Sequence, residues 1–505
     1  MAESKRYILL PREGYLSEAL KELDPGMGLT ESHAPFVVKS MLAGGRDIRI
    51  IHSIVAHGPK LVELDDPAAE EVDRHPEVRR LPVIKYARPL TKSILASFPL
   101  TAPEVIPPPG VRSPEVRITV METKGTRRVS VGSGLVVTAI SDYEKKIGDK
   151  ESTDDSGEVT LRVSGDKIQR LCCERKWTWG GYREDVPANS SIDLELEPLS
   201  DKFTDCVRKY YPQSRFNPAI GVTVGVIDTG VGPNDDLNVI GGRNAVVGEP
   251  KHDYKDVGPH GTFVAGLIGS KGIRFPKLRG LAPGVQIRSY RVFGGGLATG
   301  ADDIALVDAM YYAELDKCDI LNLSIENSGE GPGPKDDALQ LAITRARDNG
   351  MLVVVAAGND GREGVDYPAA YTGTTAVSAM GCKGTFPKGA MENMVVGEVL
   401  AGRDPNEFIA LFSNFGNQIS VTALGVGVLS TLPGNSFGSC SGTSFAAPVV
   451  TGAAASLLSQ NRKIYDMHRD RARSAEIEQL LLNNCITRGF DLKYEGRGMP
   501  DPRKV

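Results

Sequence analysis

Short apolar runs and longer helix-like stretches alternate from residue 222 onward, and this pattern constrains the fold strongly. The runs are Val222–Ile227, Val285–Val292, Ile320–Ser324 and Leu352–Ala356, and the stretches are Gly261–Ile268, Ala301–Leu315 and Asp336–Asn349. A continuous apolar run is typical of a strand buried on both faces. Strands and helices in alternation predict an α/β fold with a doubly wound parallel sheet. Ligands bind such sheets beyond the carboxyl ends of the strands, so polar residues at those ends are candidates for a functional site.

Two polar residues follow predicted strands in this way. Asp228 comes directly after the first run and precedes Thr229-Gly230, and Asn359 follows the fourth run in Ala356-Ala-Gly-Asn-Asp360. Each has a purely structural alternative, because Asp and Asn are common turn and cap residues. Either residue alone therefore leaves its role open.

His260 lies in Gly258-Pro-His-Gly-Thr262, at the predicted start of a helix. A histidine between glycines at a helix start is poorly explained as core filling, although histidine also serves as an ordinary hydrogen-bond partner. His252 is the competing candidate, but it lies in a charged stretch that is typical of a turn. We therefore favour His260 as the functional histidine.

Ser444 directly precedes the small and apolar run Phe445–Leu458, which predicts a buried helix. Gly442 gives the backbone before it the freedom to turn sharply. Unpaired N–H groups at a helix N-terminus favour developing negative charge. Ser444 is therefore a candidate nucleophile if a base reaches it, and an N-cap serine otherwise.

The four candidates together fit one reaction. A serine hydroxyl is too weak an acid to attack unaided, so His260 would take the Ser444 proton and return it to the leaving amine. Asp228 would hold the imidazole in one tautomer and stabilise its cation. Asn359 and the N–H of Ser444 would donate hydrogen bonds to the oxyanion.

Residues 219–490 resemble the subtilisin-like serine peptidases, also called subtilases. The resemblance is carried by Val226-Ile-Asp-Thr-Gly230, His260-Gly-Thr-Phe-Val-Ala-Gly266, Ala356-Ala-Gly-Asn359 and Gly442-Thr-Ser-Phe-Ala-Ala-Pro448. The order Asp, His, Ser along the chain is also that of subtilisin.

This resemblance implies the catalytic triad Asp228, His260 and Ser444, with Asn359 as oxyanion donor. It implies that the substrate is a polypeptide and that catalysis needs no cofactor or metal. It further implies that Leu323, Ser324 and Ile325, together with the Gly294–Gly300 segment, flank a cleft where an extended peptide adds as a strand.

Residues 1–92 predict a small α+β domain with the ferredoxin-like order of strand, helix, strand, strand, helix, strand. The expected elements are Arg6–Leu10, Leu16–Leu23, Ile48–Val55, Gly58–Leu64, Pro67–Arg74 and Val78–Tyr86. Glu71–Val78 and Val83–Tyr86 are similar to the last helix and strand of the inhibitory pro-region of many subtilases. The resemblance implies that this domain is an intramolecular inhibitor, although a generic α/β module is the alternative.

The remaining chain divides by composition. A proline-rich stretch at 93–115 predicts an extended linker, residues 116–198 predict a β-sandwich-like domain of short strands, and 199–218 form a connector before the catalytic domain at 219–490. Residues 491–505 are expected to form a C-terminal tail. The two tryptophans, Trp177 and Trp179, lie in the β-rich domain and form either a binding edge or, as we favour, part of a packed core.

Three departures from the family pattern affect function. Glu326 follows Ser324-Ile325 where the family usually has glycine, which predicts altered substrate pairing or specificity. The segment Lys271–Leu278 lacks the asparagine-rich loop that binds calcium in secreted subtilisins, so a structural calcium site is left open. A whole β-rich domain separates the inhibitor-like domain from the catalytic domain, so removal of a simple pro-region is not assured.

Composition bears on location and partners. The seven cysteines are scattered and form no CxxC pair, which favours reduced thiols. The apolar run near the start, Tyr7–Leu10, is too short for a signal peptide, and no stretch is long enough to span a membrane. With a net charge of −5, nothing suggests a nucleic-acid or membrane partner. We expect a cytoplasmic protein.

Two hypotheses therefore stand. The favoured one is a serine endopeptidase held as a zymogen by its N-terminal domain. The alternative is a catalytically silent protein with a subtilase fold, whose cleft is blocked by residues 1–92 and which acts through binding. A nucleotide-binding α/β protein is disfavoured, because no Walker loop or correctly placed GxGxxG is present.

Overall fold

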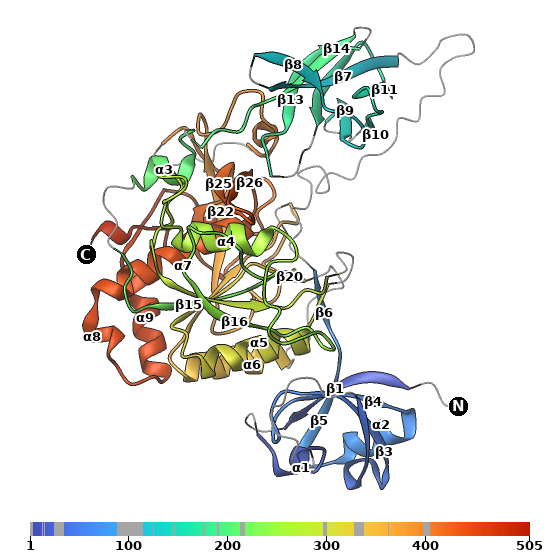
Figure 1. Ribbon diagram of the computed structural model, residues 1–505, viewed down its shortest axis with the longest axis vertical. Helices are drawn as coiled ribbons and strands as arrows, with labels where there is room; N and C mark the ends of the chain where they lie inside the picture. Colours follow the sequence, from blue (N-terminus) through green and yellow to red (C-terminus); the bar gives the residue numbers. More distant parts are fainter. Residues whose placement is uncertain are drawn as a thin grey trace.

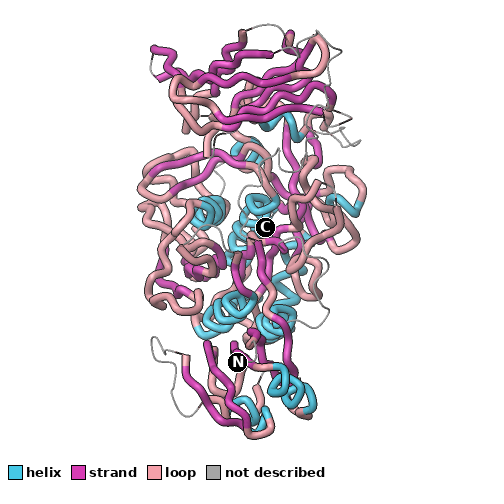
Figure 2. Tube along the Cα trace, turned by 90° about the vertical axis from the view of Figure 1, so that its right-hand side faces the viewer, coloured by secondary structure: helices cyan, strands magenta, loops and turns pink. Residues whose placement is uncertain are grey.

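A computed structural model shows three parts along the long axis of the molecule (Figure 1). The N-terminal domain lies at one end, the β-rich domain lies at the other, and the α/β domain lies between them, as the side view also shows (Figure 2). The structure describes residues 4–12, 14, 16–24, 35–87, 115–124, 126–143, 145, 147–173, 175, 177–188, 191–201, 203–212, 218–295, 300–327, 338–361, 363–396 and 404–504. Most of the expected linker, 93–115, falls outside these residues.

The N-terminal domain is an antiparallel sheet with the order β2-β3-β4-β1-β5. Its elements are β1 (Lys5–Pro11), α1 (Glu18–Lys21), β2 (Phe36–Ser40), η1 (Met41–Ala43), β3 (Arg46–Ser53), β4 (Lys60–Leu64), α2 (Asp66–Arg74) and β5 (Val78–Pro82). Without the edge strand β2, which the sequence did not predict, the order is the expected ferredoxin-like one. The strand expected at Val78–Tyr86 is wrong in one respect: it ends at Pro82, and β6 (Lys85–Ala87) leaves this sheet to join the α/β domain.

Both faces of this sheet are apolar, because both are covered. Leu9 packs with the helices of its own domain, whereas its neighbours Ile8 and Leu10 pack against helices of the α/β domain. Successive side chains of a strand point to opposite faces, so an uninterrupted apolar strand requires a partner on each side. His52 also reaches across this boundary, with Nε2 3.2 Å from Asp308 Oδ2.

The β-rich domain contains two sheets, which pack into the predicted β-sandwich. One has the order β10-β9-β12-β13 and the other β11-β7-β14, with β8 paired to β7. The strands are β7 (Glu115–Lys124), β8 (Arg127–Ser130), β9 (Val136–Asp142), β10 (Ile147–Ser152), β11 (Glu158–Arg162), β12 (Lys167–Cys173), β13 (Gly181–Pro187) and β14 (Ile192–Leu196). A single apolar cluster joins the two sheets through residues such as Ile118, Ala139 and Leu171. The charged strands β8, β10 and β13 carry no apolar alternation, so their sequences do not mark them as strands.

The α/β domain confirms the predicted doubly wound sheet. Its order is β16-β17-β15-β19-β21-β22-β23, with β24 also paired to β22, and only β23 is antiparallel. The strands are β15 (Thr223–Asp228), β16 (Val239–Asn244), β17 (Gln286–Arg291), β19 (Ile320–Leu323), β21 (Leu352–Ala356), β22 (Thr375–Cys382), β23 (Glu407–Ile409) and β24 (Ile419–Leu424). Along β15, Val224 and Val226 face one apolar cluster and Ile227 faces the other, as expected for a strand buried on both faces.

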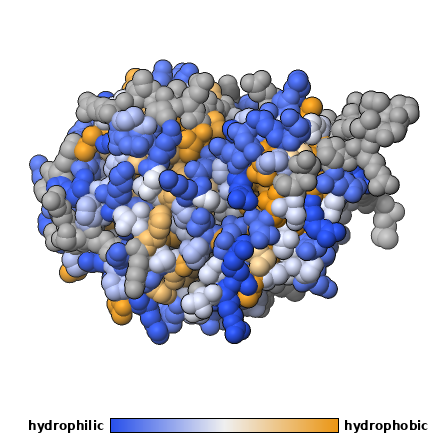
Figure 3. Space-filling view, turned by 90° about the horizontal axis from the view of Figure 1, so that it is seen from above, coloured by the Kyte–Doolittle hydropathy of each residue, from blue (hydrophilic) through white to orange (hydrophobic). Residues whose placement is uncertain are grey.

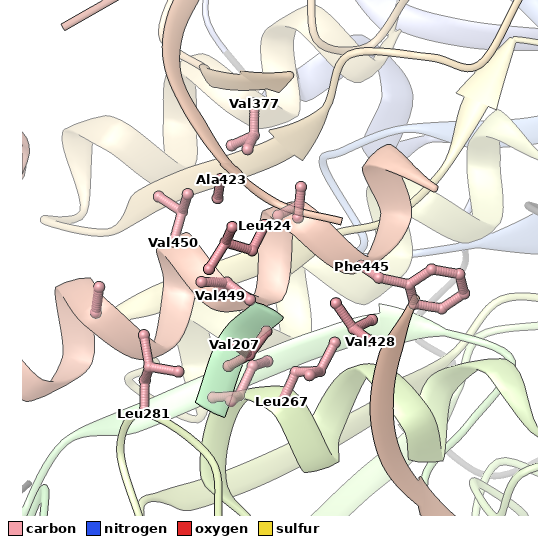
Figure 4. Close-up of a cluster of buried hydrophobic side chains, with 14 of the residues drawn as sticks. Val207, Leu267, Leu281, Val377, Ala423, Leu424, Val428, Phe445, Val449 and Val450 are labelled. Atoms are coloured by element: carbon pink, nitrogen blue, oxygen red, sulfur yellow. The ribbon is translucent and has the colours of Figure 1, made fainter. Parts of the chain in front are cut away.

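Helices cover the two faces of this sheet. Side chains of α4 (His260–Gly269), α7 (Thr443–Gln460) and α9 (Arg471–Asn483) line one cluster, and those of α5 (Asp303–Leu315) and α6 (Ala338–Asp348) line the other. Figure 4 shows the first cluster, where Val449 and Val450 of α7 pack among Leu267, Leu424 and Val428. Helix α7 is buried along almost its whole length, which its run of small and apolar residues permits.

The segments on either side of residues 219–490 pack on the α/β domain. In the connector, Asp205 and Arg208 form a buried ion pair around α3 (Cys206–Tyr210) and bond to the backbone of Leu429. The expected C-terminal tail is folded: α10 (Leu492–Glu495) and β28 (Met499–Pro500) pack in, and the Tyr211 hydroxyl donates to the Pro500 carbonyl at 2.5 Å.

The remaining described elements are short strands, a hairpin of β25 and β26, and short helical segments. They are β18 (Ala301–Asp302), β20 (Glu326–Asn327), β25 (Val428–Leu432), β26 (Ser436–Cys440), β27 (Cys485–Ile486), η3 (Met391–Val395), α8 (Arg462–Tyr465) and η4 (Pro502–Lys504). Among the described residues, no helix is both long and apolar enough to cross a bilayer. The face of the molecule seen in Figure 3 mixes hydrophilic and hydrophobic residues.

Candidate active site

Asp228 and His260 form a buried pair at the carboxyl edge of the sheet. Asp228 ends β15 and His260 begins α4, and His260 Nδ1 lies 2.8 and 3.0 Å from the two Asp228 carboxylate oxygens. A carboxylate at Nδ1 fixes that nitrogen as the protonated one and leaves Nε2 as the acceptor. Nε2 is buried and has no hydrogen-bond partner among the described residues. The ring is therefore oriented, and its basic nitrogen is free for chemistry.

A close backbone approach brings the two residues together. A Cβ added to Gly261 would lie 2.0 Å from the carbonyl oxygen of Gly230 and 3.2 Å from the Asp228 Cβ. Only glycine avoids such contact with backbone. The glycine after His260 therefore lets the start of α4 press against the end of β15.

Asp256 supports this arrangement, and the sequence reasoning did not find it. Its carboxylate accepts hydrogen bonds from the Thr229 hydroxyl at 2.7 Å, from the Gly258 N–H at 2.9 Å and from the Thr262 N–H at 2.8 Å. It thus ties the turn after Asp228 to the first turn of α4. Burial raises the pKa of Asp256 to about 6, although these hydrogen bonds oppose the shift.

Ser444 lies in the first turn of α7 and is 4% exposed. Four residues later Pro448 lacks the N–H that would normally bond the Ser444 carbonyl. That carbonyl instead accepts a hydrogen bond of 2.7 Å from the Ser324 hydroxyl, which itself accepts one from Asn322. The proline thus makes the Ser444 backbone available to Ser324, which ties the serine to the neighbouring strand end.

Aromatic packing connects His260 with the serine helix. The His260 ring lies 5.2 Å from that of Phe445, which directly follows Ser444. Phe445 packs on Phe263 at 4.8 Å, and Phe263 packs on Trp177 at 5.4 Å. Ser444 Oγ donates no hydrogen bond to any described residue. His260 and Ser444 are therefore brought to one place by the shared contact with Phe445.

The tryptophans also attach the β-rich domain. Trp177 is half-buried and its carbonyl accepts a hydrogen bond from the Ser439 N–H, while Trp179 is fully buried against Phe203. Both act as packing residues, as favoured from the sequence. His252, the alternative histidine, is exposed.

Asn359 lies after β21, and both the oxygen and the nitrogen of its side-chain amide form hydrogen bonds. Its carbonyl oxygen accepts from the Thr443 N–H at 2.8 Å and the Thr443 hydroxyl at 3.1 Å. Its Nδ2 and its backbone N–H both donate to Glu326 Oε2, each at 3.0 Å. The Asn359 side-chain donor that was expected to meet an oxyanion therefore meets the Glu326 carboxylate in this structure.

The strand ends expected to flank a substrate hold β6 of the N-terminal domain, which pairs with β18 on one side and β20 on the other. Figure 1 shows β6 reaching from the N-terminal domain to the α/β domain near β20. Tyr86 pairs antiparallel with Ala301, directly after Gly300, and Ala87 pairs with Glu326. The Ile84 carbonyl also accepts from the N–H of Asp303 at 2.9 Å.

Tyr86 is 1% exposed and belongs to the same apolar cluster as Leu323 and Ile325. Those two side chains are therefore core residues, whereas Ser324 reaches Ser444. The rest of the segment before Gly300, residues 296–299, lies outside the described residues.

Two places bear on metal binding. The segment Lys271–Leu278, which lacks the calcium-binding pattern, is held by Asp236. The Asp236 carboxylate accepts hydrogen bonds from the N–H groups of Ile273 and Arg274 at 2.6 and 3.0 Å. Within the described residues, one group has metal-ligating spacing: Glu326, Asp360 and Asp366, with oxygen atoms within 4.8 Å of one another. That group lies beside Asn359 and not at the loop.

The sequence matches known proteins in its α/β part. The model of the Subtilase family matches residues 219–499, which is more than half of the chain. The chain belongs to the subtilase family. Subtilases need no cofactor for catalysis.

This subtilase is similar in part of its sequence to several bacterial proteins. It is 36% identical to a thermostable alkaline protease of Halalkalibacterium halodurans over 239 residues, which are 46% of this chain and 56% of that protein. It is 34% identical to the alkaline elastase YaB of a Bacillus species over 250 residues, 49% of this chain and 57% of that protein. With subtilisin DY of Bacillus licheniformis it shares 35% identity over 284 residues, 55% of this chain and 88% of that protein. The subtilase thus spans little more than half the length of the first two relatives.

Proposed function

We propose that this subtilase is a serine endopeptidase that uses Asp228, His260 and Ser444 as its triad. The observation that carries the proposal is the buried Asp228–His260 pair, whose Nε2 lacks a partner among the described residues. Phe445 brings the start of α7, and with it Ser444, to the same ring. The names of the relatives, which include a protease and an elastase, also support a peptidase.

In the proposed reaction His260 Nε2 takes the proton of Ser444 as its oxygen attacks the peptide carbonyl. Asp228 stabilises the imidazolium, and the same proton then passes to the leaving amine. Asn359 Nδ2 and the Ser444 N–H donate to the oxyanion of the tetrahedral intermediate, and one such side-chain donor contributes about 3 kcal/mol. Water resolves the acyl-enzyme by the same steps in reverse.

We further propose that the N-terminal domain inhibits the enzyme. An extended peptide would add to the cleft as a strand, and β6 occupies that place between β18 and β20. The apolar contact of Ile8 and Leu10 with α5 and its neighbours supports the whole domain on the catalytic domain. The chain would then be a zymogen, whose cleft opens when β6 leaves.

Intact mass spectrometry of the full chain and of Ser444→Ala, after the same incubation, tests the peptidase. The wild type should hydrolyse an unfolded protein, and should shorten itself if the inhibitor is removed by self-cleavage, whereas the variant should do neither. Hydrolysis that survives in Ser444→Ala would overturn the assignment. Labelling of Ser444 by a fluorophosphonate distinguishes a competent triad from a silent binding protein.

We also propose a reducing compartment, such as the cytoplasm. All seven cysteines lie within the described residues, no disulfide is formed among them, and six are buried. Comparison of cell fractions by immunoblot, with alkylation to count free thiols, tests this location. Recovery of the protein outside the cell would contradict it.

A further inference from the structure

Two polar residues interrupt the apolar sheet face that α7 covers. Asn322 of β19 is paired with Val226 of β15 on one side and with Val354 of β21 on the other, and both valines belong to the apolar cluster of that face. Ser324 follows two residues later, so it continues on the same face. Both polar side chains are fully buried. Burial of an amide and a hydroxyl is unfavourable unless each forms hydrogen bonds, so their partners indicate what the two residues do.

The hydrogen bonds of these residues form one chain that begins and ends on α7. The Thr451 hydroxyl donates to Asn322 Oδ1 at 2.8 Å, and Asn322 Nδ2 donates to the Ser324 hydroxyl at 2.9 Å. The Ser324 hydroxyl in turn donates to the Ser444 carbonyl at 2.7 Å. Thr451 is fully buried as well. Thr451, Asn322 and Ser324 thus form a polar bridge that is shielded from water.

The polar bridge holds α7 at two points. Thr451 follows Ser444 by 7 residues, which is about two helical turns, so both residues lie on the helix face toward β19. Pro448 lies between them and lacks the N–H with which the helix would satisfy the Ser444 carbonyl itself. The bridge therefore fixes the rotation of α7 about its own axis as well as its position along the sheet.

The first turn of α7 is also bonded to the candidate oxyanion donor. The Thr443 N–H donates to Asn359 Oδ1 at 2.8 Å. Asn359 follows β21 and Ser324 follows β19, and these two strands are neighbours in the sheet. Adjacent strand ends thus hold the residue before Ser444 and the carbonyl of Ser444 itself. A shift of α7 would change the position of Ser444 relative to Asn359.

We infer that Asn322 and Thr451 are positioning residues, which act through Ser324 to hold Ser444 where its proposed reaction requires it. The inference rests on the proposed peptidase function. Neither residue lies in β18 or β20, the strands that would pair with a peptide. Misplacement of a reacting group by about 1 Å can cost roughly 100-fold in rate. Loss of the bridge should therefore lower kcat and leave KM nearly unchanged.

Replacement of Thr451 tests the bridge at its end farther along α7 from Ser444. Thr451→Val keeps the shape of the side chain and removes the donor to Asn322. We expect kcat for a fluorogenic peptide to fall by about tenfold or more. The rate constant for labelling of Ser444 by a fluorophosphonate should fall by a similar factor, because this reagent needs the serine but no extended peptide. Both are measured on the full chain after the incubation described above, well below the melting temperature of each variant.

Three further variants separate positioning from packing. Thr451→Ser keeps the hydroxyl and should retain most of kcat. Thr451→Ala removes the hydroxyl in a residue that favours helix, so it should match Thr451→Val and replaces that variant if valine prevents folding. Thr385→Val is the matched control, because Thr385 is buried and its hydroxyl donates at 2.7 Å to the Cys382 carbonyl, outside the bridge. It should hydrolyse the peptide as the wild type does.

A double-mutant cycle tests whether the bridge acts as one unit. If Thr451 acts only through Ser324, then Thr451→Val added to Ser324→Ala should lower kcat no further than Ser324→Ala alone. Effects on kcat that multiply independently would contradict a connected bridge.

The outcomes separate the inference from the function on which it rests. Folded Thr451→Val and Thr451→Ala variants with the kcat and the labelling rate of the wild type would overturn the inference and leave the peptidase. An equal loss in Thr385→Val would also overturn it, because the effect would then reflect packing alone. If the wild type shows neither Ser444-dependent hydrolysis nor labelling of Ser444, both proposals fail.

Discussion

Pro448 shows how one residue affects the position of Ser444, the proposed nucleophile. The missing N–H of this proline leaves the buried Ser444 carbonyl to Ser324, which donates to it at 2.7 Å. A helix normally satisfies its own carbonyls, so here the position of Ser444 depends on a second element. Ser324 is in this sense a positioning residue.

Ser324→Ala should therefore destabilise the fold by about 1–3 kcal/mol, because a buried carbonyl loses its partner. It should also lower kcat. Pro448→Ala restores the N–H within α7, so the double variant should recover part of both losses, which a double-mutant cycle measures. Ser459→Ala, which removes another hydroxyl bonded to a carbonyl of the same helix, is the control. Strict additivity of the two substitutions would contradict this account.

Asp256 leads to a prediction of how the stability of the fold depends on pH. The pKa of its carboxyl is about 6 in the fold and has an ordinary value of 3.8, because burial disfavours the charged form. Between about pH 4 and pH 6 the native chain binds a proton that the unfolded chain has released, so this residue stabilises the fold as pH falls through that window. The contribution is lost as pH rises through 6.

The comparison is between the wild type and Asp256→Asn, unfolded by urea at several pH values. The wild type should exceed the variant in stability by more at pH 4 than at pH 7. Asp348→Asn, at an exposed site, should show no such trend. A difference that stays constant with pH would contradict the assigned shift.

At the scale of elements, the aromatic series Trp177, Phe263, Phe445 and His260 crosses from the β-rich domain to the site. Each ring packs on the next at 4.8–5.4 Å. Aromatic pairs at such separations contribute roughly 0.5–1.5 kcal/mol beyond buried area. The β-rich domain is thus packed against the α/β domain and not merely connected to it by the chain.

Trp177→Ala should lower the melting temperature and reduce kcat/KM, because Phe263 loses its support. Trp177→Phe keeps a ring and should retain most of both quantities. Calorimetry and peptide hydrolysis measure the two effects. If Trp177→Ala hydrolyses peptides as the wild type does, the β-rich domain is a spacer as far as catalysis is concerned.

At the scale of the whole molecule, the N-terminal and β-rich domains both contact the α/β domain near the candidate cleft. The N-terminal domain places β6 in it, and Tyr86 is buried with Leu323 and Ile325 at the strand ends. Replacing a buried aromatic residue by alanine costs about 3–5 kcal/mol of packing. Tyr86 therefore contributes strongly to the binding of the proposed inhibitory domain.

Tyr86→Ala should accordingly release β6 and make peptide hydrolysis appear earlier or without a lag. Leu16→Ala, at an exposed position of the same domain, should leave the lag unchanged. Progress curves of fluorogenic peptide hydrolysis give the comparison. An unchanged lag in Tyr86→Ala would argue against inhibition by this segment.

Much of the α/β fold and of the candidate site could be predicted from the sequence. The signals that mark them lie within short segments of the chain. Continuous apolar runs predicted β15, β17, β19 and β21, and glycine-flanked motifs located Asp228, His260, Asn359 and Ser444. Charged strands such as β10 escaped, since their pairing depends on partners distant in the chain. Glu326 was flagged as a departure, but its contact with Asn359 depends on the tertiary fold. Asp256 was missed because a buried aspartate three residues before Pro259 has no signature of its own.

The seating of β6 has a consequence for how the enzyme would behave in dilute solution. A strand that belongs to the same chain meets its cleft at an effective concentration set by the covalent connection, so its occupancy does not fall when the protein is diluted. Once the connection is cut, the same contacts become those of a bimolecular complex, and dilution favours dissociation. A single cleavage between the domains would thus convert a permanent block into one that the concentration of the protein controls.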